Sequence, residues 1–201
     1  LLYRYTGERN LILGCPVTGR DHADLNDQIG FYVNTLVLKN QLSIEDTFLS
    51  FFGAVKNNTL EAFSHQEYPF DRLVEDLKVT RDTSRNAIFD IMISYHTFDI
   101  ESGKIPDKSD LIQDAGVQEN KFDLDISFEE RNNEVQIKLN FNTDLFNQDF
   151  IKQFLSHYSN LLAELLQHSN TRIDELNFLS TEENKQLLND FNPCLLYTSD
   201  A

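Results

Sequence analysis

The sequence predicts an α/β (α+β) fold, a two-layer sandwich in which helices pack on a mixed β-sheet. Three observations support this prediction. Short runs of β-branched and aromatic residues are typical of strands, and longer segments repeat apolar residues at helical spacing. The two kinds of segment intermix along the chain, and two neighbouring strand patterns form a hairpin.

The composition favours one packed domain without nucleic acid or membrane as a partner. The chain has 201 residues, 40% of them hydrophobic, and 33 acidic against 17 basic residues give a net charge of −16. This excess repels phosphate backbones and anionic lipids, and no apolar run is long enough to cross a membrane. There is no secretory signal, and Cys15 and Cys194 match no metal or redox spacing, so we expect a cytoplasmic protein.

A helix end and two strands open the chain. Residues 1–5 have helix character that stops at Gly7, because glycine commonly ends helices. Residues 11–16 form a short strand, which the proline ends. Residues 29–38 are rich in β-branched and aromatic side chains without clean alternation, so we expect a strand buried on both faces.

Two helices and a third strand follow. Ser43 can cap the first of these helices, and apolar residues at helical spacing extend it to about Phe63. Pro69 suits the first turn of a shorter helix over residues 70–77. Residues 87–95 return to strand character.

A long loop and a hairpin are predicted next. Residues 101–120 mix glycine and proline with charges, which favours a loop. Residues 122–128 and 135–141 both alternate apolar with polar side chains, and Asn132-Asn133 is a plausible tight turn between them. This segment therefore predicts an antiparallel hairpin.

The last part of the chain reads as two helices and a tail. Asn147 can cap a helix whose apolar stripe runs over residues 150–166. Ser180 can cap a short final helix over residues 181–189. Residues 192–201 have no periodicity, and we interpret them as the start of a linker or as non-native sequence.

Most polar candidates for chemistry have a simpler interpretation. No phosphate-binding glycine loop, dinucleotide fingerprint or metal motif is present. His157 and His168 fall on the long helix, and we expect both to face solvent. Three further groups have a catalytic or ligand-binding interpretation, but a solvated or ion-paired surface is favoured for each: His96–Asp99, Asp123–Asp125 and Arg81–Asp82–Arg85.

Arg20 and Asn34 are the strongest site candidates. Arg20 follows a Pro-x-x-Gly stretch and should project from a constrained loop, where a guanidinium suits a fixed carboxylate. Asn34 interrupts an apolar strand, and a buried amide costs free energy unless its hydrogen bonds are made. From the residues alone, tying loops together explains both side chains as well as a direct functional role does.

Four segments follow one another at characteristic spacing: ERNLILGCPVTGR (8–20), IGFYVNTLVLK (29–39), HQEYPFDRLVEDL (65–77) and RDTSRNAIFDIMISY (81–95). In order and spacing they resemble the later core motifs of the condensation domains of nonribosomal peptide synthetases. The segment FNTDLFNQDFI (141–151) continues the similarity, which covers residues 1–191.

The resemblance implies a fold of two chloramphenicol-acetyltransferase-like subdomains that form a V, with the active site in a tunnel between them. Residues 1–191 would be the C-terminal subdomain of such a domain, without its N-terminal half, and residues 192–201 would lead towards an adenylation domain. The family's catalytic motif, HHxxxDG, belongs to the missing half. This chain contains no His-His pair, so it is assigned no catalytic residue and is expected to be inactive alone.

The activity implied by the resemblance is amide-bond formation between an acyl or peptidyl thioester and an aminoacyl thioester. Both substrates would arrive on the phosphopantetheine arms of upstream and downstream carrier proteins, and the chain itself would bind no cofactor or metal. Arg20 matches the arginine that pairs with the aspartate of the missing motif, and Asn34 matches the asparagine that lines the tunnel. The VNT segment favours ordinary condensation over cyclisation or epimerisation, and residues 65–77 lean towards an L-configured donor.

Two alternatives stay open from the sequence. The first is a stand-alone acyltransferase of the same fold that uses CoA or another free thioester. The second is a non-catalytic module that docks carrier proteins. A neighbouring adenylation or carrier segment would exclude the first alternative, and an intact HHxxxDG upstream would argue against the second.

Overall fold

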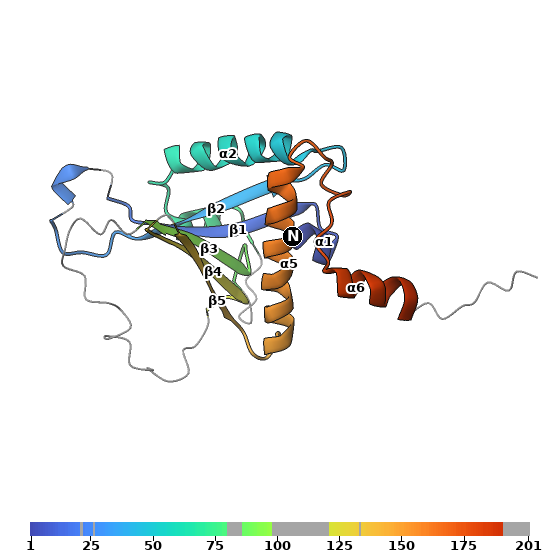
Figure 1. Ribbon diagram of the computed structural model, residues 1–201. Coiled ribbons are helices and arrows are strands. Elements are labelled where there is room, and N and C mark those ends of the chain that lie inside the picture. The colour runs from blue at the N-terminus through green and yellow to red at the C-terminus, as the bar shows by residue number, and fades with distance from the viewer. Residues whose placement is uncertain (21, 26, 80–85, 98–120, 133, 191–201) are drawn as a thin grey trace, which may run out of the picture.

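The computed structural model describes the chain except for residues 21, 26, 80–85, 98–120, 133 and 191–201. One five-stranded sheet in the order β2-β1-β3-β4-β5 forms its centre (Figure 1). The β1–β2 and β4–β5 pairs are antiparallel, and the β1–β3 and β3–β4 pairs are parallel, which confirms the mixed sheet. The strands are β1 (Asn10–Val17), β2 (Asn34–Gln41), β3 (Ile91–Thr97), β4 (Leu124–Arg131) and β5 (Glu134–Phe141).

Cap residues mark the start or the end of several helices. Gly7 ends the first helix with a left-handed φ of 74°, and the side chains of Asn147 and Ser180 accept hydrogen bonds from the first turns of the two helices that they cap. These three predictions are confirmed. The helical elements are α1 (Leu2–Thr6), η1 (Ala23–Leu25), α2 (Phe48–Ser64), α3 (Phe70–Asp76), α5 (Gln148–Gln167), α6 (Thr181–Lys185) and η3 (Gln186–Asp190).

The main core lies between one face of the sheet and the helices α1, α2 and α5. Leu11 of β1 lines a small apolar cavity of about 130 Å³ together with Phe48 of α2 and Leu161 of α5. On β4, the ring of Phe128 lies 6.0 Å from that of Tyr158 on α5. None of the helices in the described ranges is long and apolar enough to cross a membrane.

The short helix α3 covers the opposite face of the sheet. Successive side chains of a strand point to opposite faces, so Gly14 and Leu11 face opposite sides. A Cβ added at Gly14 would lie 2.2 Å from the ring of Phe89, and that ring packs against Phe70 of α3 at 5.7 Å. The connection from α2 to α3 therefore passes around the free edge of β2.

The strand predicted for residues 29–38 is wrong in its start and in its burial. β2 begins only at Asn34, and Ile29 and Phe31 are 104% and 91% exposed. Within β2, Leu36 and Leu38 are buried whereas Lys39 is exposed. This alternation arises because β2 is an edge strand, and its C-terminal half is covered on one face only.

Two other expected boundaries also shift. The first long helix begins at Phe48 because Thr47, not Ser43, caps it; the N–H of Ser43 instead donates to the Asp46 carboxylate at 2.8 Å in the preceding turn. β3 begins at Ile91, later than the predicted residue 87, since Phe89 turns its ring under Gly14. The whole loop predicted for residues 101–120 lies outside the described residues.

Candidate functional site

The two predicted site residues lie at the same end of the β1–β2 pair. In the register of that pair, Val17 is the partner of Asn34, and Arg20 follows Val17 by three residues. The segment that joins these strands projects beyond the end of the sheet, away from α6 (Figure 1). The fold therefore brings Arg20 and Asn34 to one edge, although 14 positions separate them in the sequence.

The loop that carries Arg20 is built around Tyr32. The Arg20 guanidinium lies 4.6 Å from the centre of the Tyr32 ring, and the Tyr32 hydroxyl donates to Gln28 Oε1 at 3.0 Å. Gly19 has a φ of 60°, and a Cβ there would lie 2.0 Å from the Tyr32 carbonyl oxygen. A Cβ at Gly30 would lie 2.6 Å from the Tyr32 ring. The contact at Gly19 joins the two limbs of the loop and requires glycine, because its φ is left-handed and the atom that it faces belongs to the backbone.

Arg20 uses only part of its hydrogen-bonding capacity in this loop. Its Nη1 donates to the carbonyl of Leu25, and its planar face lies over Tyr32. Within the described residues these contacts replace the carboxylate that the sequence predicts. Because a guanidinium has five N–H donors in a fixed fork, the remaining donors can still take a carboxylate from outside.

Asn34 joins the start of β2 to the turn between α2 and α3. Its Nδ2 donates to the carbonyls of Gln66 and Tyr68, both at 2.8 Å, and its Oδ1 accepts from the N–H of Phe70 at 3.1 Å. The expectation that this amide must find partners is confirmed. Since Tyr68 and Phe70 belong to the HQEYPF segment, two motifs distant in sequence meet at one carboxamide.

A groove of about 630 Å³ lies beside Asn34, where the chain turns around the edge of β2. Its walls come from the first half of β2, the end of α2 and the start of α3. Its polar groups are exposed side chains, His65 and Glu67 among them. The lining residues are Thr35, Leu36, Val37, Ala62, Ser64, His65, Glu67, Tyr68 and Leu73.

The weaker candidates do not form a reactive cluster within the described residues. Asp123 lies just before β4 and Asp125 within it, and both are half-buried. No group of three or more His, Cys, Asp or Glu in these ranges is placed to hold a metal ion. His168 is exposed, as expected. His96 is exposed at the end of β3, whereas its suggested partner and the cluster Arg81–Asp82–Arg85 lie outside the described residues.

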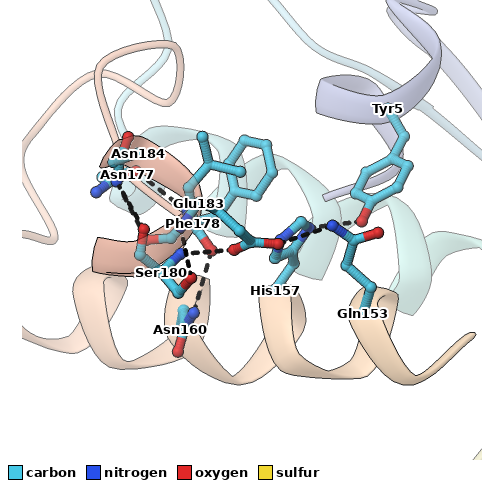
Figure 2. A network of polar contacts seen from close by, with 10 residues as sticks. Tyr5, Gln153, His157, Asn160, Asn177, Phe178, Ser180, Glu183 and Asn184 are labelled. Atoms are coloured by element: carbon cyan, nitrogen blue, oxygen red, sulfur yellow. Dashed lines mark hydrogen bonds and ion pairs between the residues drawn. The ribbon is translucent and has the colours of Figure 1, made fainter. Parts of the chain in front are cut away.

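His157 corrects the expectation that it faces solvent, because its side chain is only 4% exposed. Its Nδ1 lies 2.6 Å from the Tyr5 hydroxyl and its Nε2 lies 2.8 Å from Glu183 Oε1. Figure 2 shows this network joining α1, α5 and the start of α6. The pattern of α5 alone predicts a solvent-facing histidine at this position. The side chain is buried because α1 and α6 pack over that face of α5.

The network around His157 holds three helices together. The pKa of the Glu183 carboxyl is lowered to about 2, first by the hydrogen bond from Gln153 and next by the backbone N–H of Ser180. Burial, followed by the charge of Glu183, raises the pKa of Tyr5. With the imidazole enclosed and both ring nitrogens engaged, substrate has no access to it, so we assign this network to stability.

Sequence reasoning missed Tyr32, which organises the loop around Arg20. Tyr32 was read as one more aromatic residue of a strand. The signal that points to it is the pair of glycines, Gly19 and Gly30, on either side of a polar stretch. Such glycines mark close backbone approach.

Comparison with known proteins identifies the family. The family model described as "Condensation domain" matches residues 1–188. The chain is 38% identical over 194 residues to tyrocidine synthase 3 of Brevibacillus parabrevis, and 36% identical over 193 residues to surfactin synthase subunit 1 of Bacillus subtilis (strain 168). Each alignment covers 96% of this chain but only 3% and 5% of the two synthetases, respectively.

Solved structures agree in fold. A four-domain nonribosomal peptide synthetase bound to AMP and glycine superposes with a TM-score of 0.79 at 22% identity, covering 91% of this chain and 15% of that protein. The X-domain from teicoplanin biosynthesis superposes with a TM-score of 0.75 at 24% identity, covering 89% of this chain and 41% of that domain. With its sequence motifs, its mixed sheet and these matches taken together, the chain belongs to the condensation-domain family of nonribosomal peptide synthetases.

Proposed function

We propose that this chain is the C-terminal subdomain of a condensation domain that joins two carrier-bound thioesters through an amide bond. The family match over residues 1–188 supports the reaction class, and the relatives are synthetases many times longer than this chain. The observation that carries the assignment of the site is the preformed loop, in which Tyr32 and Leu25 hold the Arg20 guanidinium at the rim of the sheet.

In the proposed reaction, the amine of an aminoacyl thioester attacks the carbonyl carbon of an acyl or peptidyl thioester. The new C–N bond forms, the C–S bond breaks, and the thiol of the donor's phosphopantetheine arm leaves with a proton. The catalytic histidine of the HHxxxDG motif belongs to the N-terminal subdomain, and this chain holds no His-His pair. Phosphopantetheine comes with the carrier proteins.

Arg20 acts in this proposal as a positioning residue. Its free donors would pair with the aspartate of the catalytic motif across the subdomain interface and fix the orientation of that motif. Asn34 supports the same wall of the tunnel because it fixes the turn between α2 and α3 next to β2. Neither side chain touches the reacting atoms in this proposal.

The test is product formation by the intact domain with loaded donor and acceptor carrier proteins, followed by mass spectrometry. Arg20→Ala should lower kcat by about tenfold, equivalent to ~1.4 kcal/mol, with Arg20→Lys partly restoring the rate. Arg9→Ala removes an exposed arginine at the far end of β1 and is the matched control. An unchanged rate and an unchanged melting temperature in Arg20→Ala would refute the role of Arg20.

The same assay separates the proposed reaction from its alternatives. This chain alone should form no product, because the histidine motif is outside it. Turnover by the isolated chain would contradict the assignment. Activity of the intact domain with free CoA thioesters in place of loaded carriers would favour a stand-alone acyltransferase, and a folded intact domain that binds carriers without turnover would favour a docking module.

A further inference from the structure

An apolar ridge stands on the loop that carries Arg20. Ile29 is 104% exposed, Phe31 91% and Val33 54%. Phe31 and Val33 stand on either side of the half-buried Tyr32, and Ile29 precedes the bend at Gly30. Large apolar side chains exposed at three of five successive positions are more typical of an interaction surface than of single exposed apolar residues.

The loop is constructed so that the ridge points outward. Tyr32 is turned inward, where it meets the Arg20 guanidinium and Gln28. Gly19 packs against the Tyr32 carbonyl so closely that a side chain there would displace the backbone. Tyr32 is half-buried by these contacts, whereas its two neighbours, Phe31 and Val33, are exposed.

The length of related domains indicates what covers the ridge. The chain aligns over 89% of its length with the X-domain, yet it covers only 41% of that domain. More than half of a domain of this fold therefore lies outside this chain. The ridge adjoins Arg20, which makes one hydrogen bond within the described residues, from Nη1 to the carbonyl of Leu25.

We propose that Ile29, Phe31 and Val33 form the apolar anchor onto which the missing half of the condensation domain packs. This inference rests on the proposed function only in taking this chain as one part of a larger domain. The ridge supplies the buried contact, and Arg20 beside it supplies the charged one, in the usual arrangement of an apolar interface centre with a polar rim.

Hydrogen exchange on the intact domain and on this chain alone tests the proposal. The backbone amides of residues 29 and 31–33 should exchange at least about tenfold more slowly in the intact domain, as expected when an exposed segment without backbone partners in strands is covered. Phe31→Ser and Val33→Ser should abolish that slowing. Leu166→Ser is the matched control, because Leu166 is 75% exposed on α5, away from the loop, and should leave this exchange unchanged.

The outcomes distinguish this proposal from the proposed function. Phe31→Ser should leave the melting temperature of this chain unchanged, since Phe31 is exposed in it, but lower that of the intact domain by several degrees. Slowed exchange in an intact domain that forms no product would support the ridge and count against the reaction. Product formation without slowed exchange would overturn the ridge. Slowing that appears in this chain alone, together with a concentration-dependent dimer, would also overturn it by assigning the ridge to a second copy.

Discussion

The Arg20 guanidinium lies 4.6 Å from the centre of the Tyr32 ring, with its Nη1 bound to the carbonyl of Leu25. This contact positions the guanidinium before any partner arrives. A preformed guanidinium loses less conformational entropy on pairing than a free one does. The geometry thus makes Tyr32 a support for the proposed role of Arg20.

Replacing Tyr32 tests that support. Tyr32→Leu removes the cation–π contact and the hydrogen bond to Gln28, and should lower the free energy of unfolding by about 1 kcal/mol. Tyr32→Phe keeps the ring over Arg20 and should cost less than about half of that. Urea denaturation of this chain measures both changes. Equal stability of Tyr32→Leu and the unsubstituted chain would show that the stacking contributes nothing.

Replacement of Asn34 should destabilise the chain much more than replacement of an exposed asparagine such as Asn57. Asn34→Ala leaves two carbonyls and the Phe70 N–H without their partner, so we expect a loss of about 2 kcal/mol in the free energy of unfolding. Asn57→Ala, at an exposed position of α2, should be neutral or slightly stabilising because alanine favours helix.

An aspartate at position 34 separates shape from hydrogen bonding. Asn34→Asp keeps the acceptor for Phe70 but sets a negative charge against two carbonyl oxygens. Its folded-state pKa would be raised above the value of about 3.9 for a free aspartate, so its destabilisation relative to the unsubstituted chain should be largest at pH 7, shrink as the pH falls through that raised pKa, and be smallest below pH ~4. A pH-independent difference would contradict this assignment of the contacts.

The sequence predicts the elements of this fold better than their ends. Local signals placed Gly7, Asn147 and Ser180 correctly, because a cap depends on the residue itself and its nearest neighbours. The start of β2 was misplaced because residues 29–33 have strand composition but lack a strand partner on either side within the described residues. Composition shows that a segment is suited to a strand, but the segment forms one only where it pairs with another strand.

The site was predictable in its residues and less so in its contacts. Arg20 stands out in the sequence because it follows a Pro-x-x-Gly stretch, and Asn34 because it interrupts an apolar strand. The groups that Asn34 contacts come from residues more than 30 positions along the chain. Tyr68 meets Asn34 only because α2 and α3 wrap around the edge of β2. In the same way, the burial of His157 depends on Tyr5 and Glu183, which come from opposite ends of the chain.

Gly7 and Gly19 are the two glycines with left-handed φ in the described part of the chain, and Gly19 should tolerate replacement less well. Gly19→Ala adds a Cβ that meets the Tyr32 carbonyl at 2.0 Å as well as the strain of φ 60°, so we expect a loss of roughly 3 kcal/mol. Gly7→Ala carries the same kind of strain, at φ 74°, with no atom within 4 Å, and should cost about 1 kcal/mol. The difference between the two losses of stability, measured by thermal unfolding, gives the cost of the contact with the Tyr32 carbonyl. Equal losses in the two variants would show that this contact costs nothing.

The network around Glu183 should make the stability of the chain depend on acid pH. The folded-state pKa of Glu183 is about 2, below the value of about 4.3 for an unperturbed glutamate. The stabilisation is therefore fully present above pH ~5 and is lost progressively as the pH falls towards 2. Glu183→Gln should unfold more easily at pH 7, and its free energy of unfolding should fall less steeply between pH 5 and pH 2 than that of the unsubstituted chain.

Glu182 is the matched control, since it is an exposed glutamate in the same first turn of α6. Glu182→Gln should leave the pH profile between pH 5 and pH 2 unchanged. Tyr5→Phe removes the hydroxyl at His157 Nδ1 but keeps the rings of Phe150 and Phe154 packed against it, so it tests the polar contact separately. If Glu182→Gln and Glu183→Gln flatten the profile equally, the acid dependence arises from the general negative charge of α6 and the hydrogen bonds to Gln153 and Ser180 do not set it.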